Sequence, residues 1–265
     1  MEKSLHLLDS SAKHRVWAVS IVLLLSILPT SGCSTRAGWQ YEPSLARQSA
    51  VHLPVDLAVD HFDDQRQTTN ERYFWACVIP LVPDCTSDYH RPENANGFLT
   101  EAAYNFRPDD DLAEATAKEL ARTGMFRDVF LTERKADPGA PLLMRGTITN
   151  TDWYGAEYSY LLGPYGSLPW LFGLPIGSAR NSLELKLELV QVSDRRVLWS
   201  YKIHQTYQTT EGIYYNYATD FGYPQMFKAG IERAAASLQS YVESQPPHFW
   251  EGVVGASRKT GAAVN

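Results

Sequence analysis

The stretch SLELKLELVQV, residues 182–192, constrains the fold of this chain more than any other. Leucines occupy every second position from Leu183 to Leu189, and charged side chains stand between them. A period of two places the leucines on one face of a β-strand and the charges on the other, so one face of that strand contacts water. The turn SDRR leads into VLWSYKIHQTY, which predicts a second strand and an antiparallel hairpin.

Three more segments are predicted to be strands, namely VHLPVDLAVDHF from residue 51, MFRDVFLTE from residue 125 and LLMRGTITNTDW from residue 142. The first alternates apolar and polar residues and contains Pro54. Proline cannot donate a hydrogen bond to a strand ladder, so we expect this strand at a sheet edge or at a bulge.

Two amphipathic helices are predicted. Residues 109–123 carry an apolar stripe of Leu112, Ala113, Ala117, Leu120 and Ala121. Asp111 and Glu114 match a capping box, the acidic run 109–111 complements the helix dipole, and Gly124 suits the position after the helix. The second helix follows from the apolar spacing between Phe227 and Val242 and ends before Pro246 and Pro247.

The order of these elements predicts an α+β fold, with a mostly antiparallel sheet and both helices packed on one face. We expect a single domain over residues 51–245, interrupted by an insertion at 61–107 and an apolar loop at 158–179. The insertion is long and irregular in sequence. Residues 246–265 are predicted to be a polar tail.

Residues 1–32 are predicted to be a lipoprotein-type signal peptide. A basic leader precedes the apolar run Val16–Leu28, which is too short to span a bilayer. The small residues before Cys33 resemble a bacterial lipobox, in which the cysteine receives fatty acyl chains such as palmitate. Residues 33–50 would then be a tether. An ordinary signal peptide with a free Cys33 is the alternative.

The remaining cysteines, Cys77 and Cys85, flank the proline-containing segment VIPLVPD. With Cys33 acylated, an even pair is left in an oxidising compartment, which favours a disulfide that holds the insertion. A metal-binding or redox-active pair is the alternative, with His90 nearby in the sequence.

Composition argues against several classes of function. The formal net charge is −6, which is unsuited to nucleic acid. The chain has no GxSxG, HExxH, EF-hand, GxGxxG or P-loop motif, so we predict no enzyme, no cofactor and no metal. A metal site could be drawn from three histidines and nearby aspartates, but a solvated edge is the simpler interpretation. Those residues are His52, His61 and His90, with Asp60, Asp63 and Asp64.

The apolar loop 158–179 contains no charged residue, and the next charged residue is Arg180. Its three prolines would break a membrane-spanning helix. One interpretation is an Ω-type loop folded over the sheet, with Trp170, Leu171 and Phe172 buried. The other is an exposed surface that meets a partner or the membrane. The candidate interaction residues are Tyr165, Leu168, Trp170, Leu171 and Phe172.

The chain resembles the envelope lipoprotein domain shared by the TolB amino-terminal region, CsgG and LpoB. The resemblance rests on Cys33 before VDLAVDHFDD, on LAEATAKELARTGMFRDVFL, and on LLMRGTITNTDW followed by LELKLELVQVSDRRVLWSYKIHQTY. It implies a non-enzymatic accessory protein, anchored by lipid in the outer membrane and facing the periplasm, that binds an envelope protein. The alternatives are a small-ligand binder or enzyme with a pocket closed by residues 158–179, and an oligomeric secretion component.

Overall fold

The computed structural model describes residues 39–43, 49–94, 105–133, 138–216 and 221–253. The predicted leader and Cys33 lie outside these residues. The described strands are β1 (Leu53–Val59), β2 (Asp63–Asp64), β3 (Asn70–Arg72), β4 (Asp84–Tyr89), β5 (Phe126–Leu131), β6 (Leu142–Asn150), β7 (Trp153–Tyr158), β8 (Gly177–Gln191) and β9 (Arg196–Glu211). The helices are α2 (Pro108–Thr123), α3 (Leu168–Leu171) and α4 (Tyr223–Ser244), with short 3₁₀ turns at η1 (Phe74–Val78), η2 (Pro92–Asn94) and η3 (Gly163–Tyr165).

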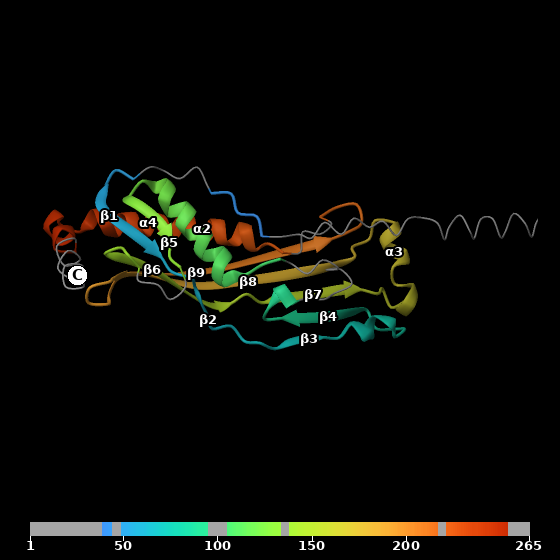
Figure 1. Ribbon diagram of the computed structural model, residues 1–265. Coiled ribbons are helices and arrows are strands. Elements are labelled where there is room, and N and C mark those ends of the chain that lie inside the picture. The colour runs from blue at the N-terminus through green and yellow to red at the C-terminus, as the bar shows by residue number, and fades with distance from the viewer. Residues whose placement is uncertain (1–38, 44–48, 95–104, 134–137, 217–220, 254–265) are drawn as a thin grey trace, which may run out of the picture. The chain divides into compact units, whose positions relative to one another are not determined.

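The strands form one sheet in the order β3-β4-β7-β8-β6-β1-β5, with β2 beside β6 and β9 beside β8. Pairing is antiparallel except where β1 meets β5 and β6 and where β2 meets β6. Helices α2 and α4 lie on the same face of this sheet (Figure 1). The predicted α+β class, with two helices on one face of a mostly antiparallel sheet, is therefore confirmed. None of the described helices has the length and hydropathy needed to cross a bilayer.

The core lies between the sheet and the two helices. The alternating leucines of β8, from Leu183 to Leu189, are at most 1% exposed, as their period of two predicted. They meet Phe227 and Leu238 of α4 and Leu112 of α2 in one cluster. The hairpin of β8 and β9 is longer than predicted, because pairing continues from Gln191↔Arg196 back to Gly177↔Glu211.

Strand β1 occupies a different place from the predicted edge. It lies between β5 and β6 and is parallel to both. The other half of the prediction is confirmed, because the register with β5 shifts between Leu53 and Asp56, around Pro54. A bulge tolerates the missing proline N–H inside a sheet.

The insertion at 61–107 is more regular than its sequence indicates. Three of its segments become strands, since β2 pairs with β6, β3 pairs with β4, and β4 pairs along all of β7. Its buried anchor is Arg66, whose guanidinium donates to Asp64, to Glu93 and, at 2.6 Å, to the hydroxyl of Thr151. The insertion therefore extends the sheet and is attached to it by a buried ion-pair network.

The helix boundaries differ from the predicted ones at their starts. Helix α2 begins at Pro108, so Asp111 is inside the helix and does not cap it. Its carboxylate instead accepts the backbone N–H of Arg107 at 2.7 Å. Gly124 adopts the left-handed conformation, φ 62°, as predicted for the residue after the helix, whereas Ala121 of the apolar stripe is exposed.

The C-terminal end is also more ordered than a polar tail. Helix α4 ends before the two prolines, as predicted, but residues 247–253 form another helical turn. Trp250 and Val253 of this turn are 5% and 3% exposed and belong to the main core. Apolar burial outweighs the polar composition around them. The remainder of the predicted tail lies outside the described residues.

Candidate interaction surface

Three chain segments meet at one end of the sheet. They are residues 73–83 between β3 and β4, residues 159–176 between β7 and β8, and residues 212–216 after β9. Their strands are neighbours, because β4 pairs with β7, β7 with β8 and β8 with β9. We call these three segments the apolar tip; its middle segment carries α3, at the end of the sheet away from β1 (Figure 1).

The apolar tip holds nearly all of the exposed large hydrophobic side chains in the described residues. Of 17 such side chains, 15 lie in the tip, and the other two are Tyr154 and Val197. The most exposed are Phe172 at 83%, Leu81 at 80% and Tyr214 at 69%. Apolar residues scattered singly are normal on a surface, whereas a gathered patch marks a contact site for protein or membrane.

The tip carries no formal charge. None of its three segments contains Asp, Glu, Lys, Arg or His. A hydrogen bond to the Glu71 carboxylate raises the pKa of Tyr73, and burial raises the pKa of Tyr160. These two phenols are therefore neutral at physiological pH.

Some side chains of residues 158–179 are buried against the domain, and others project into solvent. Trp170 is 8% exposed and its Nε1 donates to the carbonyl oxygen of Tyr158 at 3.0 Å. By contrast Tyr165, Leu168 and Leu171 are 68%, 49% and 58% exposed. The predicted interaction residues are thus on the surface except Trp170, which is a structural support. The Ω-loop interpretation, with three buried residues, holds for Trp170 alone.

The local sequence explains this orientation. Proline at the first turn of η3 and of α3 starts two short helical segments at little cost, since the N–H it lacks would be unpaired there. Gly163 has φ 55°, and a side chain there would meet the backbone of Pro80 and Val78. These turns leave Trp170 facing the sheet and Phe172 facing solvent.

The three segments of the tip are fastened to one another. The disulfide between Cys77 and Cys85 closes the first segment onto β4, which confirms the predicted pairing. The backbone N–H of Leu81 donates to Leu161 at 3.0 Å, joining the first segment to the second. The hydroxyl of Tyr214 donates to the carbonyl of Leu171 at 2.9 Å, joining the second to the third. A surface held in this way loses little conformational entropy on binding.

The histidines proposed for a metal site are dispersed. His52 contacts the carbonyl of Gly124 at 2.5 Å, and His61 contacts Asp110 at 2.7 Å. His90 contacts Asp152 at 2.6 Å. The structure therefore gives each histidine a partner of its own instead of bringing them together.

Among the described residues, one group of possible metal ligands is close enough to share an ion. It consists of Cys77, Cys85 and Glu157. The disulfide uses both sulfurs, so no thiolate is left to bind a metal there.

Asn150 and Asp152 form a turn between β6 and β7. The Asn150 side chain accepts the backbone N–H of Asp152 at 2.6 Å and donates to its carboxylate at 2.8 Å. Such a local network closes the connection between β6 and β7.

Sequence reasoning missed the first and third segments of the tip as surface. Trp75 is 63% exposed, and Ile79 and Leu81 are exposed as well. The signal was the run VIPLVP, residues 78–83, which has the same uncharged, proline-rich apolar character as residues 158–179. The tyrosines between residues 201 and 223 have different environments, with Tyr223 buried and Tyr214 exposed.

A pocket closed by residues 158–179 would be needed for the small-ligand alternative. The cavity found there, beside Cys77, Gly163 and Trp170, has a volume of about 130 Å³. Ligand pockets usually measure about 300–1,000 Å³, so this cavity does not favour that alternative.

No protein-family model and no curated protein matches the chain. Among solved structures it is similar to a DUF330 protein from Xanthomonas campestris, with 12% identity and a TM-score of 0.39 over 79% of this chain and 94% of that one. A PelC dodecamer from Paraburkholderia phytofirmans gives 14% identity and a TM-score of 0.34 over 73% and 93%. A homolog of the neuraminyllactose-binding hemagglutinin from Helicobacter pylori gives 6% and 0.39 over 83% and 99%. At these scores the likenesses carry no functional argument.

Proposed function

We propose that this chain is a non-enzymatic accessory lipoprotein of the bacterial cell envelope. In this proposal Cys33 is acylated and holds the domain at the outer membrane, facing the periplasm. The apolar tip binds a protein partner of an envelope complex. Membership of the group that includes the TolB amino-terminal domain, CsgG and LpoB belongs to the same proposal.

The apolar tip is the observation that carries the proposal. A soluble monomer rarely exposes a gathered apolar patch, because each square ångström left in water forgoes about 25 cal/mol. Tyr214, Trp75 and Phe172 are of the residue types that dominate binding energy at protein interfaces. The absence of charge in the tip also fits the centre of an interface, where charged residues are depleted.

In-cell photocrosslinking tests the tip directly. A photoreactive amino acid replaces Phe172 in one strain and Leu81 in a second, since these side chains project from different segments. A third strain carries it at Val197, which is exposed but lies outside the tip. We expect the same protein adduct from Phe172 and Leu81 and none from Val197.

Two further variants complete the test. Leu171→Asp, which adds charge at an exposed position of the tip, should abolish the adduct from Leu81. Cys33→Ala should release the protein from membranes and lower the adduct yield. Equal labelling at Phe172 and Val197 would contradict the proposal. Adducts with lipid alone would also contradict it, because they would show that the tip contacts the bilayer and not a protein.

A further inference from the structure

The strand β9, which runs from Arg196 to Glu211, forms an open edge of the sheet. With 16 residues it is the longest of the described strands, and β8 is its only described partner. Figure 1 shows these two strands side by side. The strands β3 and β5, which end the strand order, have three and six residues. An open edge is a template for another strand, so edge strands are usually short or interrupted, and β9 is neither.

The backbone direction along β9 follows from the hydrogen bonds on the far side of β8. In β6, the carbonyl of Ile148 accepts a hydrogen bond from the backbone N–H of Gln65 at 2.9 Å, so the backbone of Ile148 faces away from β8. Ile148 lies opposite Leu185 of β8, and the backbone of Leu185 therefore faces β9, where its partner is Ile203. Since backbone groups alternate in direction along a strand, the even-numbered residues around Ile203 direct their N–H and C=O groups away from the sheet.

Five residues in the middle of β9 therefore carry outward-facing backbone groups, and pairing with β8 continues through all of them without a register shift. They are Ser200, Lys202, His204, Thr206 and Gln208. Their side chains are exposed. Among the described residues, one of these backbone groups has a hydrogen-bond partner, because the His204 carbonyl accepts from the Gln205 side chain at 2.7 Å. The other outward N–H and C=O groups are open to water or to a second strand.

The strand β9 lacks most of the features that keep an edge from pairing. Residues 196–211 contain no proline and no glycine, and many of them have high β-propensity. Of the five outward-facing residues, Lys202 alone carries a formal charge. On the helix-covered face, Tyr201 and Tyr207 are half-buried against the main core, so part of each ring stays in water. A strand added to this edge would cover more of these rings, which is favourable.

We propose that the open edge of β9 pairs antiparallel with the same edge of a second copy of this chain. The two strands are related by a two-fold axis beside His204, so this residue faces its own counterpart. In this register Ser200 of one copy lies opposite Gln208 of the other, and Lys202 lies opposite Thr206. The inference is independent of the partner-binding role proposed for the apolar tip.

A second copy fits this edge in hydrogen bonds and in side-chain faces. Five hydrogen-bonded pairs that exchange two bonds each give about ten bonds between the copies, a number typical of protein interfaces. Every such pair joins two even-numbered residues, so the helix-covered faces of both sheets stay on the same side. On that face Tyr201 lies opposite Tyr207 of the second copy, and aromatic cross-strand pairs of this kind are stabilising.

The charge pattern selects the register. An axis at Lys202 would place that lysine opposite its own counterpart, and an axis at Ile203 would place it opposite a second basic side chain, His204. Like charges directly opposite each other destabilise a strand pair. The axis at His204 places Lys202 opposite Thr206 instead, and it still pairs nearly the whole length of both strands.

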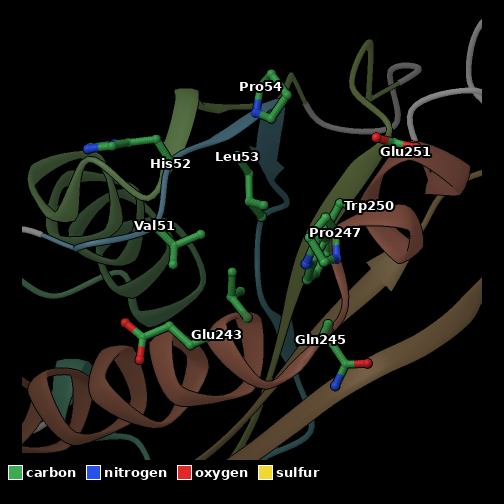
Figure 2. A pocket seen from close by; sticks show the side chains of 10 residues that line it. Val51, His52, Leu53, Pro54, Glu243, Gln245, Pro247, Trp250 and Glu251 are labelled. Carbon is green, nitrogen blue, oxygen red and sulfur yellow. The ribbon is translucent and has the colours of Figure 1, made fainter.

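Two other apolar surfaces offer contacts between copies and have to be distinguished from the edge. One is the apolar tip, which the antiparallel arrangement would place at opposite ends of the joined sheet, because β9 runs into the tip. The other is a cleft of about 640 Å³ beside Trp250, lined by the start of β1, the end of α4 and residues 247–253 (Figure 2). None of the residues that line this cleft belongs to β9.

Cysteine crosslinking in intact cells tests the register. His204→Cys should give a disulfide-linked dimer under mild oxidation, because the Cα atoms of a hydrogen-bonded pair are about 5.5 Å apart, within reach of a disulfide. Lys202→Cys alone should give none, since the two copies of residue 202 would lie about 13 Å apart. Co-expression of Lys202→Cys and Thr206→Cys chains should give a dimer that neither chain gives alone. The unchanged chain, which retains Cys33, is the control.

Variants at Thr206 test the same pairing in the purified full chain, by sedimentation in non-ionic detergent. Thr206→Glu would face Lys202 twice per dimer and should tighten association about fivefold, whereas Thr206→Lys should weaken it about fivefold. Thr206→Pro removes an outward N–H but no bond to β8, so it should fold and should weaken association at least about tenfold. Thr206→Val, which keeps the N–H, is the matched control and should leave the dissociation constant unchanged.

Leu171→Asp in the tip and Pro247→Asp in the cleft, both at exposed positions, should leave the dimer intact. A chain that sediments as a monomer at every concentration, or equal crosslinking at residues 202 and 204, would overturn the proposal. So would a dimer that Leu171→Asp or Pro247→Asp disrupts and Thr206→Pro does not. A crosslink from residue 204 to a different protein, in place of the dimer, would assign the edge to a strand of that protein and exclude the second copy. Crosslinks from the tip are independent of each of these outcomes.

Discussion

The indole nitrogen of Trp170 donates a hydrogen bond to the carbonyl oxygen of Tyr158 at 3.0 Å, and this bond joins α3 to the end of β7. Two residues later, Phe172 is 83% exposed. Two aromatic side chains of the same short segment therefore have opposite roles. Trp170 holds the apolar tip in place, and Phe172 is part of the exposed surface of the tip.

Trp170→Ala should destabilise the protein, while Phe172→Ala should not. Removal of the buried indole leaves a cavity and an unpaired carbonyl, for which we expect a loss of about 3 kcal/mol in the free energy of unfolding. The exposed phenyl contributes little, so its removal should stay within about 0.5 kcal/mol. Urea denaturation measures both variants. Similar values for the two would show that the segment is not supported by Trp170.

Reduction of the disulfide between Cys77 and Cys85 should lower stability by about 2–3 kcal/mol. The bond closes a short loop, and its main effect is to restrict the unfolded chain. Thermal unfolding with and without a reductant measures the change, and Cys77→Ser with Cys85→Ser should reproduce it. Cys33→Ser, which leaves this pair intact, is the control. A double variant as stable as the oxidised parent would contradict this expectation.

Arg66→Met should cost about 3–5 kcal/mol, because it leaves the carboxylates of Asp64 and Glu93 without their buried counter-ion. The Arg66 side chain is 1% exposed, whereas that of Arg91, which also pairs with Asp64, is 23% exposed. Arg91→Met is therefore a matched control with a smaller expected loss. If urea denaturation gave the same loss of unfolding free energy for both variants, the burial of Arg66 would not explain its importance.

Stability should depend on pH through His90. The hydrogen bond from its ring to Asp152 raises the pKa of His90 above its ordinary value. A raised folded-state pKa means that the contribution is fully present below about pH 6.5, the unfolded value, and is lost as pH rises through the folded pKa. Proton NMR of the His90 ring measures that pKa. In Asp152→Asn it should fall toward 6.5, and an unchanged value would exclude this ion pair as the cause.

The periodic elements could be predicted because their signals are local. The alternation around Leu185 and the helical spacing around Ile231 depend on residues close in sequence, and both faces are buried as expected. Helix α2 starts one residue before the predicted 109, and the predicted cap Asp111 lies inside it, because Pro108 is itself a good first helical residue. The capping-box pattern at Asp111 suggested a later start of the helix than Pro108 does.

The predicted interaction residues divide between the surface and the core. Four of its five residues are exposed in the apolar tip, including Phe172 and Tyr165, and Trp170 is buried. A sequence without charge is compatible with either burial or exposure, since apolar side chains occur in cores and at interfaces. The cleft at Trp250 had no sequence signal, because its walls come from three separate parts of the chain.

Local pattern in the sequence was enough to predict the strands and helices with a clear period, the one disulfide pair available beside Cys33, and the lack of charge in residues 158–179. Long-range packing places β1 inside the sheet, pairs β4 with β7, and brings three distant segments together as one apolar tip. Periodicity reports which face of an element is apolar, and that information is local. Which elements become neighbours depends on pairing and packing between residues far apart in the chain, so it is settled only when the whole core forms.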